Sequence, residues 1–298
     1  MNKQKLILKF FQKDGQLKIS NQAYRQTITS LFRWLIANDE IEKDITSQLL
    51  KLHPKKTARI ISHESATVAG IEEISYLIKQ FTKLSFKPLL KDCNAVKNKQ
   101  AVAQIQGSSN EILAYGRTII NFLQRMSGIA TQTNHLIKQT PSNIYLAATR
   151  KTPWGSLDKK AVTVGGGLTH RLNLSDGILI KDNHLKLISI QEALIKTFKL
   201  HHQLIEIEVK TQEELKQAIS AFNQLKTDNY LGIMFDNFSA AEIKKTITQL
   251  NNHEVIYEAS GGINESNLKE YCQSGVDIIS LGSLTHSSRA ADFSLEII

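Results

Sequence analysis

The chain has 298 residues, 41% of them hydrophobic, and its 37 basic and 28 acidic side chains give a formal net charge of +9. This composition excludes a disordered protein, and the length allows one large α/β domain or two smaller ones. No apolar stretch approaches the ~20 residues of a membrane helix, and two cysteines are too few for a disulfide framework. We therefore expect a cytoplasmic protein without membrane segments.

The first part of the chain reads as a mixture of helix and strand. An amphipathic helix is indicated around residues 24–37, and short apolar runs near 58–61 and 101–105 indicate strands. Apolar residues then recur at helical spacing between about 116 and 138, which predicts one long helix. We place a domain boundary near residue 110.

From about residue 144 onward, short apolar runs alternate with amphipathic stretches, which predicts βα units. Spacings of 22 to 28 residues between successive strand ends favour parallel strands. Hydroxyl residues followed three positions later by glutamate predict helix N-caps at Ser189, Thr211 and Ser239, and Asn264 is a fourth candidate. The seven expected strands are 144–148, 161–164, 178–180, 204–209, 231–235, 255–257 and 277–281.

Polar residues follow most of these strands, which is where parallel βα proteins bind ligands. A single charged residue at a strand end is more often a solvated loop residue or a cap, but six of seven strands ending this way indicate a site. The strand-end segments are Thr149-Arg150-Lys151, Lys181-Asp182-Asn183-His184, Glu208, Asp236-Asn237, Glu258-Ala259-Ser260-Gly261-Gly262 and Gly282-Ser283.

The chemistry of these segments points to a strongly acidic ligand. Glycine-rich turns at Ser260-Gly261-Gly262 and Gly282-Ser283 suit a phosphate, although each could be only a structural turn. Glu208 and Asp236 suit Mg²⁺ or a ribose diol. If the two acids formed ion pairs with nearby cations, some cations would still be unpaired, because the cations outnumber the acids. The cations are Arg150, Lys151, His170, Arg171 and Lys181. Gly165-Gly166-Gly167 could let the backbone approach a ligand or another strand.

Seven motifs together resemble the quinolinate phosphoribosyltransferase family, also called nicotinate-nucleotide pyrophosphorylase (carboxylating). They are NFLQRMSGIATQT at 121–133, ATRKTP at 148–153, GGGLTHRLNLSDGILIKDNH at 165–184, EIEV at 206–209, MFDNF at 234–238, EASGGI at 258–263 and GSLTHS at 282–287. The resemblance runs from about residue 39 to 287, because DEIEKDITS at 39–47 is similar to a further segment of the family.

The resemblance implies a type II phosphoribosyltransferase with two α/β domains. Residues 1–110 would form an N-terminal α/β sandwich, to which residues 287–298 could return, and residues 111–286 an incomplete, about seven-stranded TIM-like α/β barrel. The implied reaction converts quinolinate and phosphoribosyl pyrophosphate into nicotinate mononucleotide, CO₂ and pyrophosphate in NAD biosynthesis, with Mg²⁺. A homodimer or larger assembly would share each active site between subunits.

The resemblance also implies roles for single residues. Lys151 would lie between substrate and pyrophosphate, and Glu208 and Asp236 would bind the ribose and Mg²⁺, directly or through water. The quinolinate ligands would be Thr149, Arg150, His170, Arg171 and Lys181, with Arg117 from the neighbouring subunit. The phosphoribosyl pyrophosphate ligands would be Lys151, Lys181, Asn183, Glu208, Asp236, Ser260, Gly261, Gly262, Leu281, Gly282, Ser283 and His286.

Two segments depart from the family pattern. Gly116 stands where the family usually has glutamate, and the loop at Pro153-Trp154-Gly155 is about two residues shorter and lacks an arginine. Trp154 could stack on the pyridine ring or pack at a subunit interface.

Other functions compete with this interpretation. The molybdenum-transport-associated pyrophosphorylase homologue shares most motifs but has a different substrate, and an aldolase or isomerase barrel would share only the phosphate turns. Residues 1–100 carry 18 basic and 9 acidic residues, whereas the rest carries 19 of each. This excess could be a solvated face or could attract an anion, but no aromatic-basic platform supports nucleic-acid binding, so we expect none.

Overall fold

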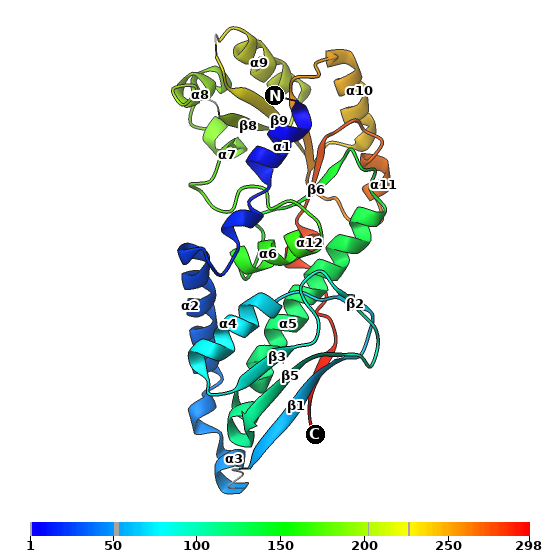
Figure 1. Ribbon diagram of the computed structural model, residues 1–298. Helices are drawn as coiled ribbons and strands as arrows, with labels where there is room; N and C mark the ends of the chain where they lie inside the picture. Colours follow the sequence, from blue (N-terminus) through cyan, green and yellow to red (C-terminus); the bar gives the residue numbers. More distant parts are fainter. Residues whose placement is uncertain (1, 51–53, 202, 226) are drawn as a thin grey trace. The chain divides into compact units, whose positions relative to one another are not determined.

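The computed structural model describes residues 2–50, 54–201, 203–225 and 227–298 (Figure 1). The chain folds into two compact units. The barrel unit comprises the first thirteen residues, Leu136–Lys151 and Gly167–Ser283, and the sandwich unit comprises Asp14–His135, Thr152–Gly166 and Leu284–Ile298. The chain therefore passes between the units several times, whereas the sequence analysis expected one boundary near residue 110 and a return of residues 287–298 to the N-terminal domain.

The barrel unit is built on a sheet of six parallel strands. Leu168 adds backbone hydrogen bonds to the free edge of the first strand, donating to Leu146 and accepting from Ala148. Among the described residues no ladder joins this segment to the other edge of the sheet, so the barrel is incomplete. In sheet order the strands are β6 (Tyr145–Ala148), β11 (Ile278–Leu281), β10 (Ile256–Ser260), β9 (Tyr230–Asp236), β8 (Leu204–Val209) and β7 (Ile178–Ile180).

Helices connect these strands, and three begin at the predicted caps. Ser189 and Thr211 each accept a hydrogen bond from the amide three residues later, and Ser239 forms a full capping box with Glu242. Asn264 does not cap a helix, because the next one begins after Asn267. The helices of this unit are α1 (Lys3–Phe11), α7 (Asp182–Leu185), α8 (Ile190–Thr197), α9 (Gln212–Asn223), α10 (Ala240–Leu250) and α11 (Leu268–Tyr271).

Helix α1 seals the end of the barrel where the strands begin (Figure 1). Its buried residues Leu6, Ile7 and Phe11 pack against the first residues of three strands, Leu204, Ile256 and Ile278. This helix leaves the opposite end of the sheet as the end available for ligands, and nothing in the sequence pattern predicted it.

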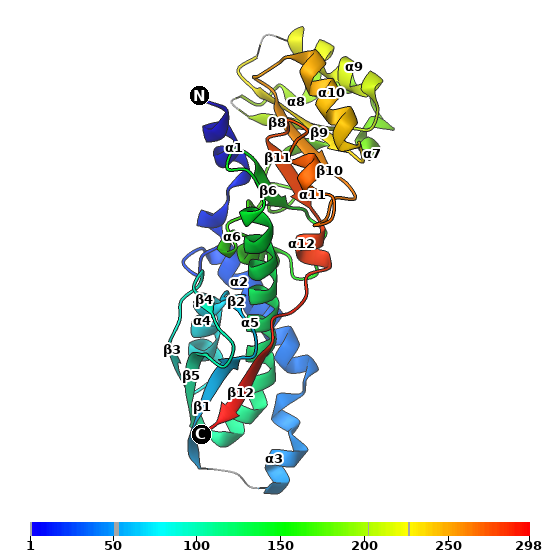
Figure 2. The same cartoon turned by 90° about the vertical axis from the view of Figure 1, so that its right-hand side faces the viewer.

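The sandwich unit contains an antiparallel sheet and the long helix α5 (Ser109–Lys138), of which all but the last turn belongs to it. The sheet order is β12 (Phe293–Ile297), β1 (Lys55–Ser62), β5 (Ala101–Ser108) and β3 (Ser85–Pro88), and Figure 2 shows β12 beside β1. β12 thus comes from the C-terminal residues that the sequence grouped with the N-terminal domain. The remaining elements are β2 (Ala66–Thr67), β4 (Ala95–Val96), α2 (Gln22–Asn38), α3 (Ile45–Leu50), α4 (Ile71–Phe81), α6 (Ser156–Val164) and α12 (Ser283–His286).

The strand expected at residues 161–164 is wrong, because these residues end helix α6. Leu157, Ala161 and Val162 are all fully buried, a helical spacing rather than an alternating one. The glycine after the helix has a packing role, since a Cβ atom on Gly165 would lie 2.6 Å from the carbonyl oxygen of Ala130 in α5. Gly165 therefore allows close helix packing, and contact with a ligand is not needed to explain it.

None of the helices in the described ranges is long and apolar enough to span a membrane.

Candidate active site

The carboxyl ends of the barrel strands bring most of the predicted site residues to one edge of the sheet. Thr149, Arg150 and Lys151 follow β6, and Lys181 follows β7. Glu208 lies in β8, and Asp236 is the last residue of β9. The register of β10 with β9 places Ser260 beside Asp236. The sequence therefore predicted correctly that these segments converge.

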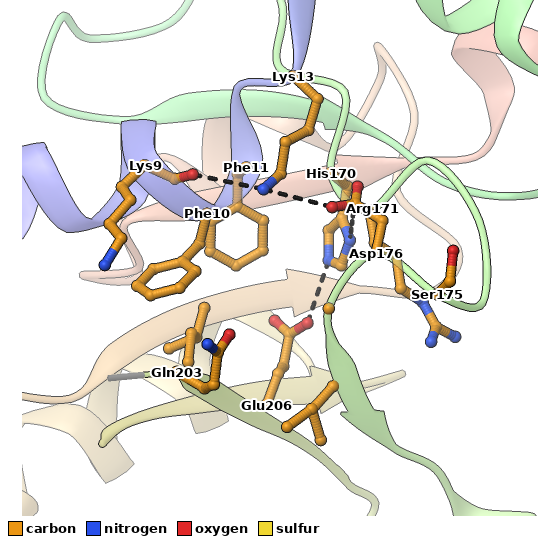
Figure 3. A pocket seen from close by; sticks show the side chains of 13 residues that line it. Lys9, Phe10, Phe11, Lys13, His170, Arg171, Ser175, Asp176, Gln203 and Glu206 are labelled. Carbon is orange, nitrogen blue, oxygen red and sulfur yellow. Dashed lines mark hydrogen bonds and ion pairs between the residues drawn. The ribbon is translucent and has the colours of Figure 1, made fainter. Parts of the chain in front are cut away.

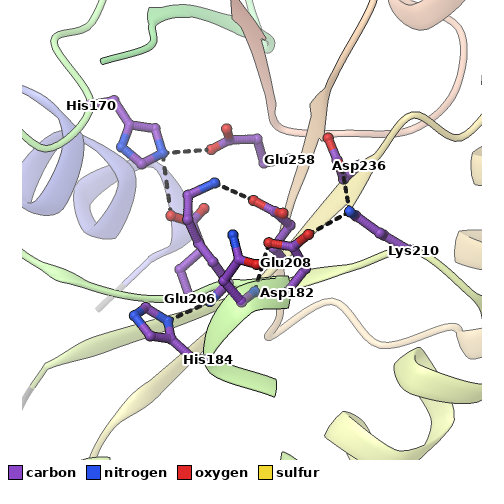
Figure 4. A network of polar contacts seen from close by, with 10 residues as sticks. His170, Asp182, His184, Glu206, Glu208, Lys210, Asp236 and Glu258 are labelled. Atoms are coloured by element: carbon purple, nitrogen blue, oxygen red, sulfur yellow. Dashed lines mark hydrogen bonds and ion pairs between the residues drawn. The ribbon is translucent and has the colours of Figure 1, made fainter. Parts of the chain in front are cut away.

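The carboxylates at this edge are paired with lysines (Figure 4). Lys181 forms an ion pair with buried Glu208. Lys210 lies 2.7 Å from Asp182 and 3.9 Å from Asp236, and its hydrogen bond lowers the pKa of Asp182. Sequence reasoning missed Lys210, although it comes directly after β8 and so carries the same strand-end signal as the other residues.

A second polar cluster lies deeper in the barrel. His170 Nε2 lies 3.2 Å from Glu206 and 3.1 Å from Glu258, and all three residues are buried (Figure 4). Burial and the negative charge of Glu258 raise the pKa of Glu206 to about 7. The sequence did not identify Glu206 or Glu258 as partners of His170, although Glu206 stands two residues before Glu208 and faces the same side of β8.

This cluster has the spacing of a metal site, but its hydrogen bonds favour a shared proton. The Nδ1 atom of His170 accepts a hydrogen bond from the backbone N–H of Arg171 at 2.8 Å. A histidine that binds a metal through Nε2 instead donates from Nδ1. Both ring nitrogens of His170 are thus occupied by protein groups.

A cavity of about 310 Å³ lies beside this cluster on the side of helix α1, where the strands begin, and not at the edge that carries Glu208 and Asp236 (Figure 3). The ring of Phe11 meets the imidazole of His170 edge-on at 4.8 Å, and the Lys13 ammonium lies 3.3 Å from Asp176. Arg171 lines the cavity, and burial together with the positive charge of Arg150 lowers its pKa. The carboxylates of Glu206, Asp176 and Glu208 act in the opposite direction, so the positive charge of Arg171 is partly offset within the protein.

The turn after β10 needs glycine. Gly261 has φ +96°, and a Cβ atom there would lie 2.9 Å from the backbone nitrogen of Asn237. Asn237 itself has φ +62° and donates its N–H to the Ser260 carbonyl at 2.9 Å. Gly262 is also left-handed, with φ +64°. Backbone N–H groups in such a turn can line a concave surface that suits a phosphate.

Comparison with known proteins decides the family. The model described as quinolinate phosphoribosyl transferase, C-terminal domain, matches residues 129–296, and the corresponding N-terminal domain matches residues 44–127. The chain belongs to the quinolinate phosphoribosyltransferase family. It is therefore a phosphoribosyltransferase enzyme, as the motifs predicted.

Relatives in distant organisms support this assignment. The probable nicotinate-nucleotide pyrophosphorylase (carboxylating) of Methanocaldococcus jannaschii is 36% identical over 86% of this chain and 92% of its own. The protein of the same name in Bacillus subtilis is 34% identical over 85% and 88%. The solved nicotinate-nucleotide pyrophosphorylase of Francisella tularensis is 36% identical, covers 92% of this chain and 96% of its own, and superposes with a TM-score of 0.80. These names do not favour the molybdenum-associated branch.

The sandwich unit explains one departure from the quinolinate phosphoribosyltransferase pattern. Gly116 lies in α5 against β12, and a Cβ atom there would lie 2.7 Å from the side chain of Leu295. The glutamate that is usual at this position in the family would need Leu295 to move. The neighbouring Arg117 is exposed.

Three predicted ligands have other surroundings. Arg117 and His286 belong to the sandwich unit, where His286 Nδ1 lies 2.5 Å from the Ser287 hydroxyl. Asn183 is exposed on α7 and accepts a hydrogen bond from Lys186. Their roles stay predictions.

Proposed function

We propose that the chain transfers a phosphoribosyl group to quinolinate and releases nicotinate mononucleotide, CO₂ and pyrophosphate. The observation that carries this proposal is the group of cationic side chains Arg150, Lys151 and Lys181, which follow strands β6 and β7. It lies in the same unit as the carboxylate pair Glu208 and Asp236 at the ends of adjacent strands. A dicarboxylate acceptor and a ribose donor need these two complementary sets.

Quinolinate would be held by its two carboxylates. Arg150, Arg171 and Lys181 would supply the charge, and Thr149 a hydroxyl group. Because Lys181 is now paired with Glu208, the incoming carboxylate would compete for the ammonium group. His170 would have to release Glu206, Glu258 or the Arg171 amide before it could bind substrate directly.

Phosphoribosyl pyrophosphate would lie across the strand ends. Glu208 and Asp236 would accept hydrogen bonds from the ribose hydroxyls, and Lys151, with Asn183, would face the pyrophosphate. The left-handed turn at Ser260–Gly262 supports a 5′-phosphate site there. The rest of that site would come from Leu281, Gly282, Ser283 and His286.

Mg²⁺ fits the donor set of this edge, because carboxylate oxygens are the ligands it prefers. Glu208 and Asp236 would hold it, directly or through water, together with the pyrophosphate. When bound, it would offset the negative charge of the leaving pyrophosphate.

Glu208, Asp236 and Lys151 would stabilise charges that develop during the reaction, and no covalent bond between enzyme and substrate would form. The bond from ribose C1 to pyrophosphate breaks, the electron pair leaves with the pyrophosphate, and the pyridine nitrogen bonds to C1. Glu208 and Asp236 stabilise the positive charge that develops on the ribose, and Lys151 stabilises the departing anion. The positive ring then takes up the electron pair left when the 2-carboxylate departs as CO₂, and the ring carbon gains a proton from water.

We further propose a homodimer or larger assembly in which Arg117 reaches the neighbouring subunit's site. The exposure of Arg117 on α5 is compatible with this role. We expect the protein in the cytoplasm, in keeping with the free thiols of Cys93 and Cys272. Fractionation of cells tests the location.

The deciding experiment is an assay of the purified protein with quinolinate, phosphoribosyl pyrophosphate and Mg²⁺. Nicotinate mononucleotide and CO₂ should form in equal amounts, and nicotinate in place of quinolinate should give no product. Equal use of nicotinate would contradict the dicarboxylate site. No product from either acid would contradict the proposed function.

A further inference from the structure

A buried ion pair inside the sandwich unit joins two segments that carry predicted ligands. Arg125, on α5, contacts Asp158, on α6, through two parallel hydrogen bonds, Nε to Oδ1 at 2.6 Å and Nη2 to Oδ2 at 2.7 Å. The Asp158 side chain is fully buried. Neither residue entered the predicted site.

Asp158 holds the loop that directly follows Lys151. It accepts hydrogen bonds from the Thr152 hydroxyl and from the backbone N–H of Trp154, the latter at 3.2 Å. The Trp154 ring lies against Phe122, with ring centres 5.2 Å apart, and the Arg125 guanidinium lies 5.3 Å from its centre. Trp154 therefore packs within its own unit, and the residue before the shortened loop and the loop's middle residue are both anchored to Asp158.

Arg125 holds a second segment. Its Nη2 atom donates to the carbonyl oxygen of Thr285 at 3.1 Å. Thr285 directly precedes His286 and comes two residues after Ser283, both predicted to bind the 5′-phosphate. One ion pair thus anchors the backbone next to Lys151 and next to His286.

The hydrogen bonds of Asp158 are more numerous than an ion pair needs if its role is only to stabilise the fold. A buried ion pair is often no more stabilising than apolar residues of the same volume. Asp158 nevertheless accepts four hydrogen bonds, and two of them come from the loop rather than from the arginine. Such a set fixes geometry, and small displacements of substrate-binding groups slow catalysis strongly.

We propose that Arg125 and Asp158 are positioning residues for the binding of phosphoribosyl pyrophosphate, because they fix the backbone at Thr152, next to Lys151, and at Thr285, next to His286. The inference rests on the proposed function. It also gives the shortened Pro153-Trp154-Gly155 loop a structural role, because a short loop reaches the ion pair in few residues and leaves the backbone at Thr152 little freedom to move.

The test uses graded variants of the full chain. Thr152→Val removes one loop hydrogen bond and keeps the side-chain shape. Asp158→Asn removes the charge but keeps an acceptor oxygen. Arg125→Met combined with Asp158→Leu replaces the whole pair by apolar groups and guards against an unpaired buried charge. Tyr24→Phe is the matched control, because it removes the buried hydrogen bond of Tyr24 to Glu73 at 2.8 Å elsewhere in the same unit.

The readouts are thermal unfolding, kcat, and KM for each substrate. We expect Thr152→Val to raise KM for phosphoribosyl pyrophosphate about 5-fold, and the double variant to lower kcat/KM for it on the order of 100-fold. KM for quinolinate should change less, and Tyr24→Phe should leave all three constants unchanged.

Two results would overturn the inference. One is a folded double variant with wild-type kinetics, and the other is a Thr152→Val protein indistinguishable from Tyr24→Phe in KM. Variants that do not fold leave Thr152→Val to decide the question. Failure of the wild-type protein to turn over quinolinate would instead refute the proposed function, so the two failures are distinguishable.

Discussion

At the scale of single residues, the site is a set of charges that already compensate one another. Lys181 is paired with Glu208, Lys210 with Asp182, and His170 with two glutamates. When substrate binds, these side chains therefore exchange their present protein partners for substrate groups. A residue whose present partner resembles a substrate group should be the most sensitive to substitution.

Lys181 is such a residue. Lys181→Ala should lower kcat/KM for quinolinate on the order of 100-fold, because it removes a cation from the carboxylate site and leaves buried Glu208 unpaired. Steady-state kinetics checks this. Lys196→Ala is the control, since Lys196 forms an exposed ion pair with Glu192. Wild-type kinetics in the Lys181 variant would remove it from the site.

The buried carboxyl of Glu73, in the sandwich unit, should make the free energy of unfolding depend on pH. It is fully buried, and burial together with the charge of Asp92 raises its pKa from 4.5 to about 7. The folded state therefore holds a proton that the unfolded state has lost. The protonated Glu73 carboxyl contributes its full stabilisation of the folded state below pH about 4.5. This contribution is lost as pH rises through about 7, so the free energy of unfolding falls by about 3 kcal/mol across this range.

Denaturant unfolding of the wild type and Glu73→Gln across this range measures the effect. The difference between their free energies of unfolding should change with pH in that window and be constant above it. A difference that does not change with pH would show that Glu73 titrates normally. Glutamine keeps a partner for the Tyr24 hydroxyl, so the variant should fold.

At the scale of elements, the sequence predicted the helices and strands that are determined by the pattern of neighbouring residues. Six of the seven expected strands and the long helix are confirmed, because alternation, caps and helical spacing are properties of neighbouring residues. The strand at 161–164 was wrong because Leu157, Ala161 and Val162 are buried at helical spacing, and this burial outweighs the β-branched residues of the segment. Helix α1 was missed as a barrel seal because its partners Leu204, Ile256 and Ile278 lie about 200 to 270 residues away in the chain. For the same reason Glu206 and Glu258 did not appear as partners of His170.

The turn after β10 makes a prediction at this scale. Gly261→Ala should raise KM for phosphoribosyl pyrophosphate at least 10-fold, because φ +96° is strained for alanine and the new methyl group meets Asn237. Gly15→Ala is the control, since nothing lies within 4 Å of a Cβ atom there. Kinetics at saturating quinolinate measures the effect. An unchanged KM would place the 5′-phosphate elsewhere.

At the scale of the whole molecule, a site shared between subunits can be tested by mixing two inactive proteins. Arg117→Ala and Lys181→Ala should each be nearly inactive, as the loss of about 100-fold expected for Lys181→Ala implies, if both residues serve the same site from different subunits. After exchange of subunits, half of the dimers are mixed, and each mixed dimer has one intact site. Activity should return to about a quarter of that of the wild type. Activity that stays at the level of the separate variants would place Arg117 in its own subunit's site.

Helix α1 also bears on how the chain reaches its native state. Leu6 and Ile7 pack with Ile278, although almost the entire sequence, including most of the sandwich unit, lies between them. Contacts of such high sequence separation form slowly, because closing a long loop costs entropy before any contact stabilises it. The apolar face of α1 must therefore wait, exposed, until the last barrel strand has been made. During synthesis on the ribosome, the exposed apolar face of this short helix therefore needs protection from aggregation.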